Sequence, residues 1–351
     1  MKILWNPRIW IATASVLVVM AASPVTSSPP SQAPPKVVTP PQESLLDDPV
    51  DGEPVAMELA GRRPLAVIIE NFPDARPQWG LSLASRVYEA ITEGGITRYL
   101  AVFGPTDGDR VGPVRSVRTQ FLNYVLELDA AVAHVGGNAD ALDHITTFHI
   151  KNLDQFRYAE AYRRILVPHL ALEHTMFTST RALRDLMDRS GWGEKVVVDH
   201  PRWKAAMPPG LRPARQKVTI EFSFPEYRVA WVYRPGTDDY QRLLAGVEDV
   251  DAATGTPVTA TSIAIAVIPR IHGRTQIRED TWTFSDVGSG RAWIIQDGTE
   301  TEGQWQKASR TDRLRFLDGA GREIEVNRGR QWIEIVPPEV TPDVESMFAI
   351  E

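Results

Sequence analysis

The chain has 351 residues, of which 43% are hydrophobic, so it can bury a large core, and we expect two domains behind a separate N-terminal segment. Its net charge of -7 argues against a general nucleic-acid binder, because such a protein needs a basic surplus to displace counterions from phosphates. Cysteine is absent, which excludes disulfides, thiolate metal sites, cysteine nucleophiles and a lipid-bearing cysteine.

The N-terminal segment has the features of an export signal. Lys2 and Arg8 precede an apolar run of 14 residues, 9–22, which is shorter than the roughly 20 residues of a membrane-spanning helix. Pro24 follows the run closely and disfavours cleavage, so residues 1–22 are either a signal peptide or an uncleaved anchor. Both alternatives place the protein outside the cytoplasmic membrane, secreted or anchored. The proline-rich residues 23–60 are predicted to be a disordered linker.

Residues 61–210 are predicted to form a layered α/β-type domain with a mixed sheet, because strand-like apolar runs alternate with segments of helical periodicity. The expected strands are 64–69, 96–103 and 130–135, and the expected helices are 82–93, 117–128, 138–147 and 178–188.

Residues 215–338 are predicted to form a second, mostly antiparallel β-rich domain, because short β-type runs are separated there by Gly, Asp and Pro. These runs are 217–224, 229–233, 263–269, 281–284, 292–295 and 332–336. Residues 339–351 are left as a tail, and the fold class is α+β.

Two arginines after a Gly-Pro turn form the most informative motif. Arg115 and Arg118, three residues apart, are expected to share a helical face, and Ser116 is expected to cap the helix start. Arginine pairs with phosphate or carboxylate through two parallel hydrogen bonds, and a helix start adds N–H donors. With the Gly136-Gly137 turn nearby, the motif predicts an anion site; a buried arginine network that only holds loops is the alternative.

Carboxylates form a second group. Glu70 and Asn71 end a predicted strand, and Glu89 and Glu93 are expected on one helix face at i and i+4. Carboxylates that meet in a cleft can divide the roles of general acid and base. We favour the alternative that each pairs with an arginine, for which Arg76, Arg98, Arg115 and Arg118 are available.

His134 ends a strand before two glycines, where it could face a cleft, although a hydrogen-bonded structural histidine is commoner. The spacing of His144 and His149 with Asp140 and Asp143 matches no zinc pattern, so neither metal nor cofactor is predicted. Ser116 lacks the flanking glycines of a nucleophile elbow.

The ordered motifs of this chain resemble those of the exported bacterial proteins named after the YerB lipoprotein, the DUF3048 family. The motifs are 64–71, 75–78, 80–81, 87–89, 93–98, 112–118 and 134–137, followed by 237–240, 288–290, 303–305, 316–319 and 329–333. The resemblance implies a two-domain α+β architecture outside the cytoplasm. It does not imply a particular reaction. Lipoprotein members use an acylated cysteine, so attachment here must come from the leader, or the protein is released.

We therefore expect a cell-envelope protein whose first domain binds an anionic envelope ligand or glycan and which contacts the membrane only through an uncleaved leader. A hydrolase or transferase acting on envelope glycan and a non-catalytic scaffold are the alternatives, and whether it is an enzyme stays open. The expected ligand-binding residues are Asn71, Arg76, Glu93, Arg98, Arg115, Ser116, Arg118, His134 and Asn138.

Overall fold

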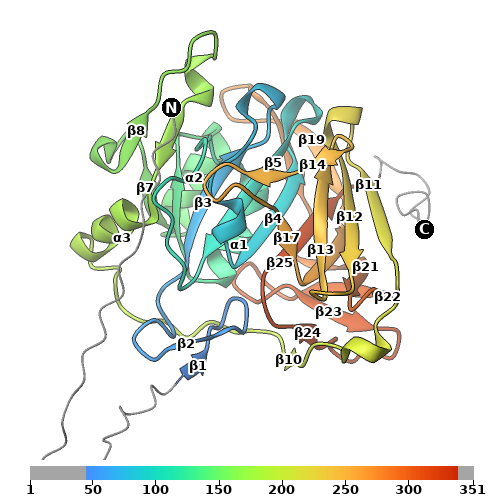
Figure 1. Cartoon of the computed structure of the whole chain (residues 1–351). Helices are drawn as coiled ribbons and strands as arrows, with labels where there is room; N and C mark the ends of the chain where they lie inside the picture. The colour runs from blue at the N-terminus through green and yellow to red at the C-terminus, as the bar shows by residue number, and fades with distance from the viewer. Residues whose placement is uncertain (1–44, 339–351) are drawn as a thin grey trace, which may run out of the picture. The chain divides into compact units, whose positions relative to one another are not determined.

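A mixed ten-stranded sheet forms the centre of the protein. The structure, a computed structural model, describes residues 45–338 (Figure 1). The strand order is β23-β22-β21-β18-β25-β4-β5-β3-β6-β7. These strands are β3 Leu65–Glu70, β4 Arg86–Ile91, β5 Thr97–Phe103, β6 Ala131–His134, β7 Lys151–Asp154, β18 Ser262–Val267, β21 Gly288–Gln296, β22 Thr299–Lys307, β23 Arg315–Asp318 and β25 Gln331–Val336. The observed fold class is α+β, as predicted.

The two sequence regions share this sheet. Strand β25 lies between β18 and β4 and is parallel to both, so Glu334 sits directly opposite Glu89 in the register. On the other side of β4 the order β4-β5-β3 is antiparallel, whereas β3, β6 and β7 are parallel. Residues 45–338 all lie within one compact unit, which does not test the predicted domain boundary near residue 210. That boundary stays a prediction.

Both faces of the sheet are buried. Along β3, Val67 and Ile69 pack on one face with Leu183 of α3 and Trp231 of a second sheet, while Ile68 faces the opposite core with α1 and α2. The second sheet has the order β11-β12-β13-β14, with β17 paired to β13, and consists of β11 Lys217–Glu221, β12 Arg228–Arg234, β13 Asp239–Leu244, β14 Val247–Glu248 and β17 Thr259–Ala260. The large sheet therefore has α1 and α2 on one face, and α3 with the small sheet on the other (Figure 1).

The described residues contain three α-helices. Helices α1 Thr119–Glu127 and α2 Ala139–Thr147 fall within predicted segments, and α3 Thr180–Arg189 extends one residue beyond the predicted segment 178–188. Asn138 and Ser179 cap α2 and α3 by accepting hydrogen bonds from backbone N–H groups of the first turn. The predicted helix 82–93 is wrong. Its core is strand β4, which is buried at every residue, so the sequence shows no alternation that would distinguish it from a buried helix.

The remaining strands form short pairs. They are β1 Leu45–Asp47 with β2 Pro54–Ala56, β8 Tyr162–Arg164 with β9 Met176–Thr178, β10 Trp203–Lys204 with β24 Val326–Asn327, β15 Val250–Asp251 with β16 Thr256–Pro257, and β19 Arg270–Arg274 with β20 Asp280–Phe284. Within the predicted linker 23–60, only residues 45–60 are described, and they correct the prediction because they are folded: they form the β1–β2 hairpin and bury Asp48 and Val50 beside it. Residues 1–44, with the predicted leader, and the tail 339–351 lie outside the described residues. Within residues 45–338 no helix is long and apolar enough to span a membrane.

Limited proteolysis tests how firmly the two regions hold together. Arg215 is exposed between them and offers a tryptic site. Because β25 is hydrogen-bonded between β4 and β18, we expect a chain cut after Arg215 to remain one particle in gel filtration. Fragments that separate and stay folded would instead establish two independent domains.

Candidate functional site

Arg115 is held at the end of β3 by a buried carboxylate. The backbone N–H of Arg115 donates to Ile68 O, which brings its side chain beside Glu70. Arg115 Nε lies 3.1 Å from Glu70 Oε1, and His174 Nδ1 donates to Glu70 Oε2 at 2.8 Å. His174 stacks on the Phe72 ring at 5.1 Å between centroids. Glu70 is only 2% exposed, so its charge requires both partners and fixes the guanidinium in place.

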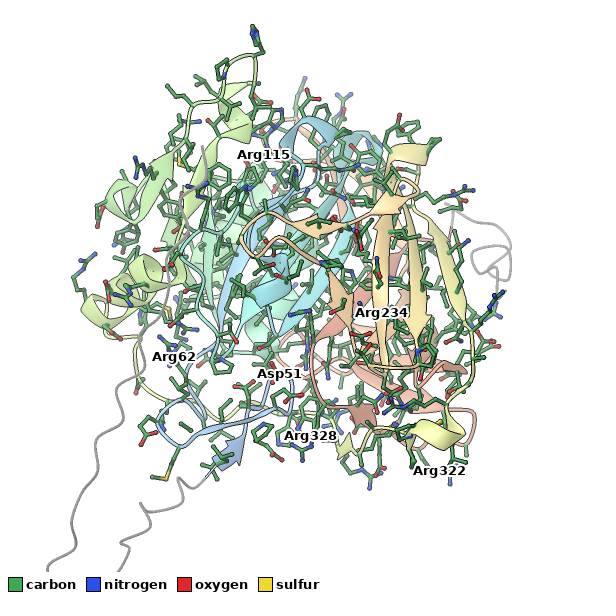
Figure 2. All side chains as sticks on the ribbon, viewed as in Figure 1. Asp51, Arg62, Arg115, Arg234, Arg322 and Arg328 are labelled. Atoms are coloured by element: carbon green, nitrogen blue, oxygen red, sulfur yellow. The ribbon has the colours of Figure 1, made fainter. Side chains whose placement is uncertain are left out.

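A cavity of about 560 Å³ lies on the outer side of Arg115. Its lining comprises Val114, Arg115, Ser116, Val135, Gly136, Gly137, Leu142, Asp154, Phe156, Arg164, Leu172, Glu173 and Met176. Arg115 Nη2 donates across it to Glu173 Oε1 at 3.2 Å. In Figure 2, Arg115 lies near the opposite end of the molecule from Asp51 and Arg328. Of the predicted ligand-binding residues, the cavity lining contains Arg115 and Ser116.

Arg98 and Arg118 do not line this cavity. Arg118 Nε donates to Glu93 at 2.8 Å, and Arg98 Nη1 donates to the Ser116 carbonyl oxygen at 2.8 Å. Arg98 is 6% exposed, and its Nε has no hydrogen-bond partner among the described residues. Burial, with the nearby charge of Arg118, lowers the pKa of Arg98 to about 9. Arg118 is the extended N-cap of α1, so the expected helical face shared with Arg115 and the cap by Ser116 are wrong.

Three further predicted residues have structural contacts. His134 is fully buried, with Nδ1 2.9 Å from Gly136 O and Nε2 2.9 Å from Asn152 Oδ1. Burial lowers its pKa, so the neutral ring is favoured. Asn138 caps α2, and Ser116 Oγ donates to Val135 O at 2.9 Å. The hydrogen-bonded structural histidine is therefore what the structure shows.

Asn71 and Arg76 belong to a different network. Arg76 Nε donates to Asn71 Oδ1 at 3.0 Å, and Asn71 Nδ2 donates to Thr97 Oγ1 at 2.7 Å and weakly to Glu89 Oε1 at 3.4 Å. None of these residues lines the cavity beside Arg115. The structure therefore separates Asn71 and Arg76 from the cavity beside Arg115.

Glu89 belongs to a buried cluster of charged residues that joins the two sequence regions. Arg242 of β13 donates to Glu89 Oε2 at 2.6 Å and also pairs with Asp249. Its guanidinium lies 4.8 Å from the Trp332 ring centroid. Glu334, beside Glu89, accepts from Trp231 Nε1 at 2.8 Å. The expected helix face with Glu89 and Glu93 is wrong, because Glu89 lies in strand β4 and Glu93 in the 3-10 turn that follows.

The sequence pattern did not reveal His174, Arg242 or Glu334 as members of these networks. Glu334 gave a usable signal, since a charge inside a continuous apolar strand indicates a buried partner. His174 and Arg242 gave none, because their partners lie 104 and 153 residues away in the chain.

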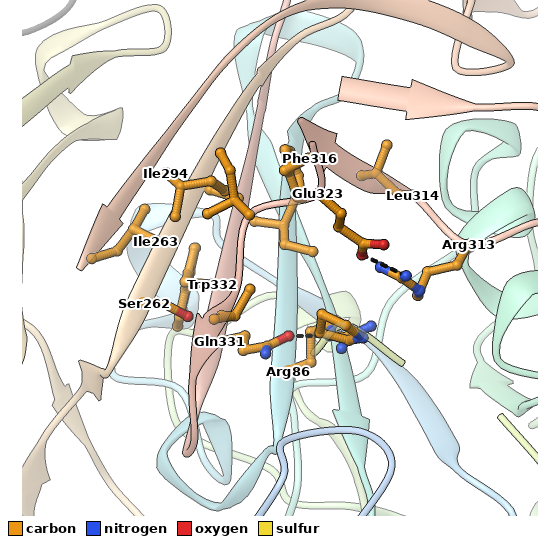
Figure 3. Close-up of a pocket in the computed structure, with 15 residues that line it drawn as sticks. Arg86, Ser262, Ile263, Ile294, Arg313, Leu314, Phe316, Glu323, Gln331 and Trp332 are labelled. Atoms are coloured by element: carbon orange, nitrogen blue, oxygen red, sulfur yellow. Dashed lines mark hydrogen bonds and ion pairs between the residues drawn. The ribbon is translucent and has the colours of Figure 1, made fainter. Parts of the chain in front are cut away.

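The described residues also form other cavities, one of them about 600 Å³ with His144, Asp286 and Arg310 in its lining. The pocket in Figure 3 has space of only about 30 Å³ between β18, β25 and the loop after β23, enough for one or two waters. Arg86 donates to Gln331 there, and Arg313 pairs with Glu323. Within residues 45–338 no group of three or more His, Asp or Glu side chains is placed to hold a metal.

The fold and these contacts define an α+β protein in which two sequence regions build one mixed sheet around buried ion pairs. Residues 51–193 match the N-terminal and residues 218–333 the C-terminal domain of the DUF3048 family, described as proteins of unknown function. The chain belongs to this family, as its motifs indicated.

A relative and a solved structure support this membership. The chain is 28% identical over 300 residues to a candidate lipoprotein, YerB of Bacillus subtilis (strain 168), a match that covers 83% of this chain and 86% of the relative. It is also similar to the crystal structure of YerB protein from Bacillus subtilis, with a TM-score of 0.75 and 26% identity, covering 87% of this chain and 99% of that one.

Proposed function

We propose that the protein works outside the cytoplasmic membrane, in the cell envelope, and binds a phosphate- or carboxylate-bearing ligand in the cavity beside Arg115. The apolar run 9–22 and the lipoprotein name of the relative support the location. Since this chain has no cysteine, its attachment to the membrane would come from an uncleaved leader.

One observation carries the ligand proposal: a surface carboxylate already occupies the cavity side of Arg115. Glu70 fixes the guanidinium from within, whereas the Glu173 side chain is 55% exposed and bonds to the outward-facing Nη2. An exposed ion pair of this kind contributes little stability, so a ligand anion can replace Glu173 at low cost. Arg115 is then held ready to bind a carboxylate or phosphate.

Removing the competing charge should strengthen anion binding. We expect Glu173→Gln to raise the affinity for inorganic phosphate roughly two- to tenfold in calorimetric titration, and to leave the unliganded melting temperature within a few degrees. Arg115→Gln should abolish the binding. Glu160→Gln is the matched control, because Glu160 also forms an exposed ion pair, with Arg189, but does not line this cavity. Equal effects of the two glutamate changes, or no phosphate binding by any variant, would reject the site.

Two alternatives each have a specific observation in their favour. A non-catalytic scaffold is favoured by the pairing of most predicted site residues with other groups of the protein. A hydrolase or transferase is favoured by the pair formed by His174 Nδ1 and Glu70 at 2.8 Å, since a carboxylate that orients a histidine is a common arrangement of a general base. Among residues 45–338, no serine or threonine hydroxyl forms a hydrogen bond with His174.

The location has a direct test. A reporter that is active only outside the cytoplasm, fused after Glu351, should be active. Intact chains recovered from membranes would indicate an anchor, whereas mature chains that begin near Ser23 would indicate cleavage. Activity of a reporter restricted to the cytoplasm would contradict export.

A further inference from the structure

The cavity beside Arg115 has one apolar wall that is exposed to solvent. Phe156, in the turn after β7, is 76% exposed, and Leu172, in the 3-10 turn before β9, is 61% exposed. Leu142 of α2 is half-buried beside them, and the buried Val114 and Met176 form the apolar floor. Large hydrophobic side chains gathered around one cavity indicate a surface that receives an apolar group.

The other wall carries charge that the protein only partly neutralises. Asp154 Oδ1 accepts hydrogen bonds from the backbone N–H groups of Gly136 and Phe156, so this carboxylate stabilises the turn. Arg164 donates to the Leu172 carbonyl oxygen and to Thr175 Oγ1, and among the described residues it forms no ion pair with a carboxylate. When Glu173 leaves Arg115, the charged wall therefore favours an anion.

From these two walls we infer that the ligand is an anionic amphiphile. Its phosphate or carboxylate head binds Arg115 and Arg164, and its aliphatic part packs against Phe156, Leu172 and Leu142. This inference rests on the proposed anion site and adds the chemical class of the ligand. The volume of about 560 Å³ lies within the range of small-molecule pockets and far exceeds that of a bare phosphate.

A series of alkyl phosphates separates the contribution of the head from that of the chain. Methyl, butyl and octyl phosphate, each below its micellar concentration, are titrated into the folded protein by calorimetry. We expect the affinity to rise roughly two- to fourfold for each added methylene until the apolar wall is covered. The double variant Phe156→Ser with Leu172→Ser should bind methyl phosphate normally and lose most of this dependence on chain length.

Leu211→Ser is the matched control, because Leu211 is 73% exposed and lies outside the cavity lining. It should keep the dependence on chain length. If all three phosphates bind equally and Arg115→Gln abolishes this binding, the anion site stands and the amphiphile is rejected. If affinity rises with chain length but Arg115→Gln has no effect, or octanol binds as well as octyl phosphate, the anionic head is rejected and the proposed function with it. Absence of binding by every phosphate rejects both.

Discussion

Arg242→Met is expected to lower the free energy of unfolding by about 3 to 5 kcal/mol, enough to prevent accumulation of a protein of ordinary stability. Arg242 is fully buried and pairs with Glu89 and Asp249, which come from different parts of the chain. The methionine would leave both carboxylates in the interior without a counter-charge, and an uncompensated buried charge is among the most destabilising changes. Chemical denaturation followed by tryptophan fluorescence measures the loss.

The control for this experiment is Arg234→Met on the neighbouring strand β12. Arg234 forms a two-pronged ion pair with Asp239, but its side chain is 37% exposed. Solvent screening limits such a pair to about 1 kcal/mol or less. If Arg242→Met fails to accumulate, Arg242→Lys keeps the charge with fewer donors and should give a stability between those of the methionine variant and the native protein. Equal small effects of both methionine changes would show that the buried cluster does not hold the two regions together.

The helices and six of the ten strands in the large sheet were predictable because their signals are local. Segment 117–128 contains α1, and segment 138–147 contains α2. Strand β4 was not predictable, because it lies in the middle of the sheet with both faces covered. A fully buried strand has no polar face that would mark its two-residue period. The β1–β2 hairpin was missed for a different reason, since prolines nearby dominate the composition.

The sequence predicted several residues of the candidate site, but it did not predict all of their pairing partners. The sequence placed Arg115, Ser116 and the Gly136 turn together, and in the structure they line one cavity. It also suggested that carboxylates would pair with nearby arginines, which is correct for Glu70 and Glu93. Glu89 pairs instead with Arg242, because the parallel contact of β25 with β4 brings the small sheet of the C-terminal region over that strand. Only tertiary structure determines such a contact.

The stability of the protein is expected to fall as pH rises above the ordinary pKa of a glutamate, and Glu334→Gln is expected to remove a large part of that fall. Complete burial, reinforced by the negative charge of Glu89, raises the pKa of Glu334 well above its ordinary value of 4.5. Below pH 4.5 the folded and unfolded states both hold the proton, and the contribution of Glu334 is fully present. Between that pH and the raised folded pKa, only the folded state holds it, so each pH unit costs about 1.4 kcal/mol.

Glutamine has the shape of the protonated acid and keeps an oxygen that can accept from Trp231 Nε1, so the variant cannot acquire the buried charge. Urea unfolding of both proteins across pH 5 to 9 provides the measurement. Other titrating groups, such as Asp286, whose burial raises its pKa to about 6, contribute equally to both curves and cancel in the difference. We expect the two proteins to be similar near pH 5, and the variant to become progressively more stable than the native protein as pH rises. A difference that is constant over this range would show that Glu334 is ionised in the folded protein at every pH tested, and that Arg242 balances its charge together with that of Glu89.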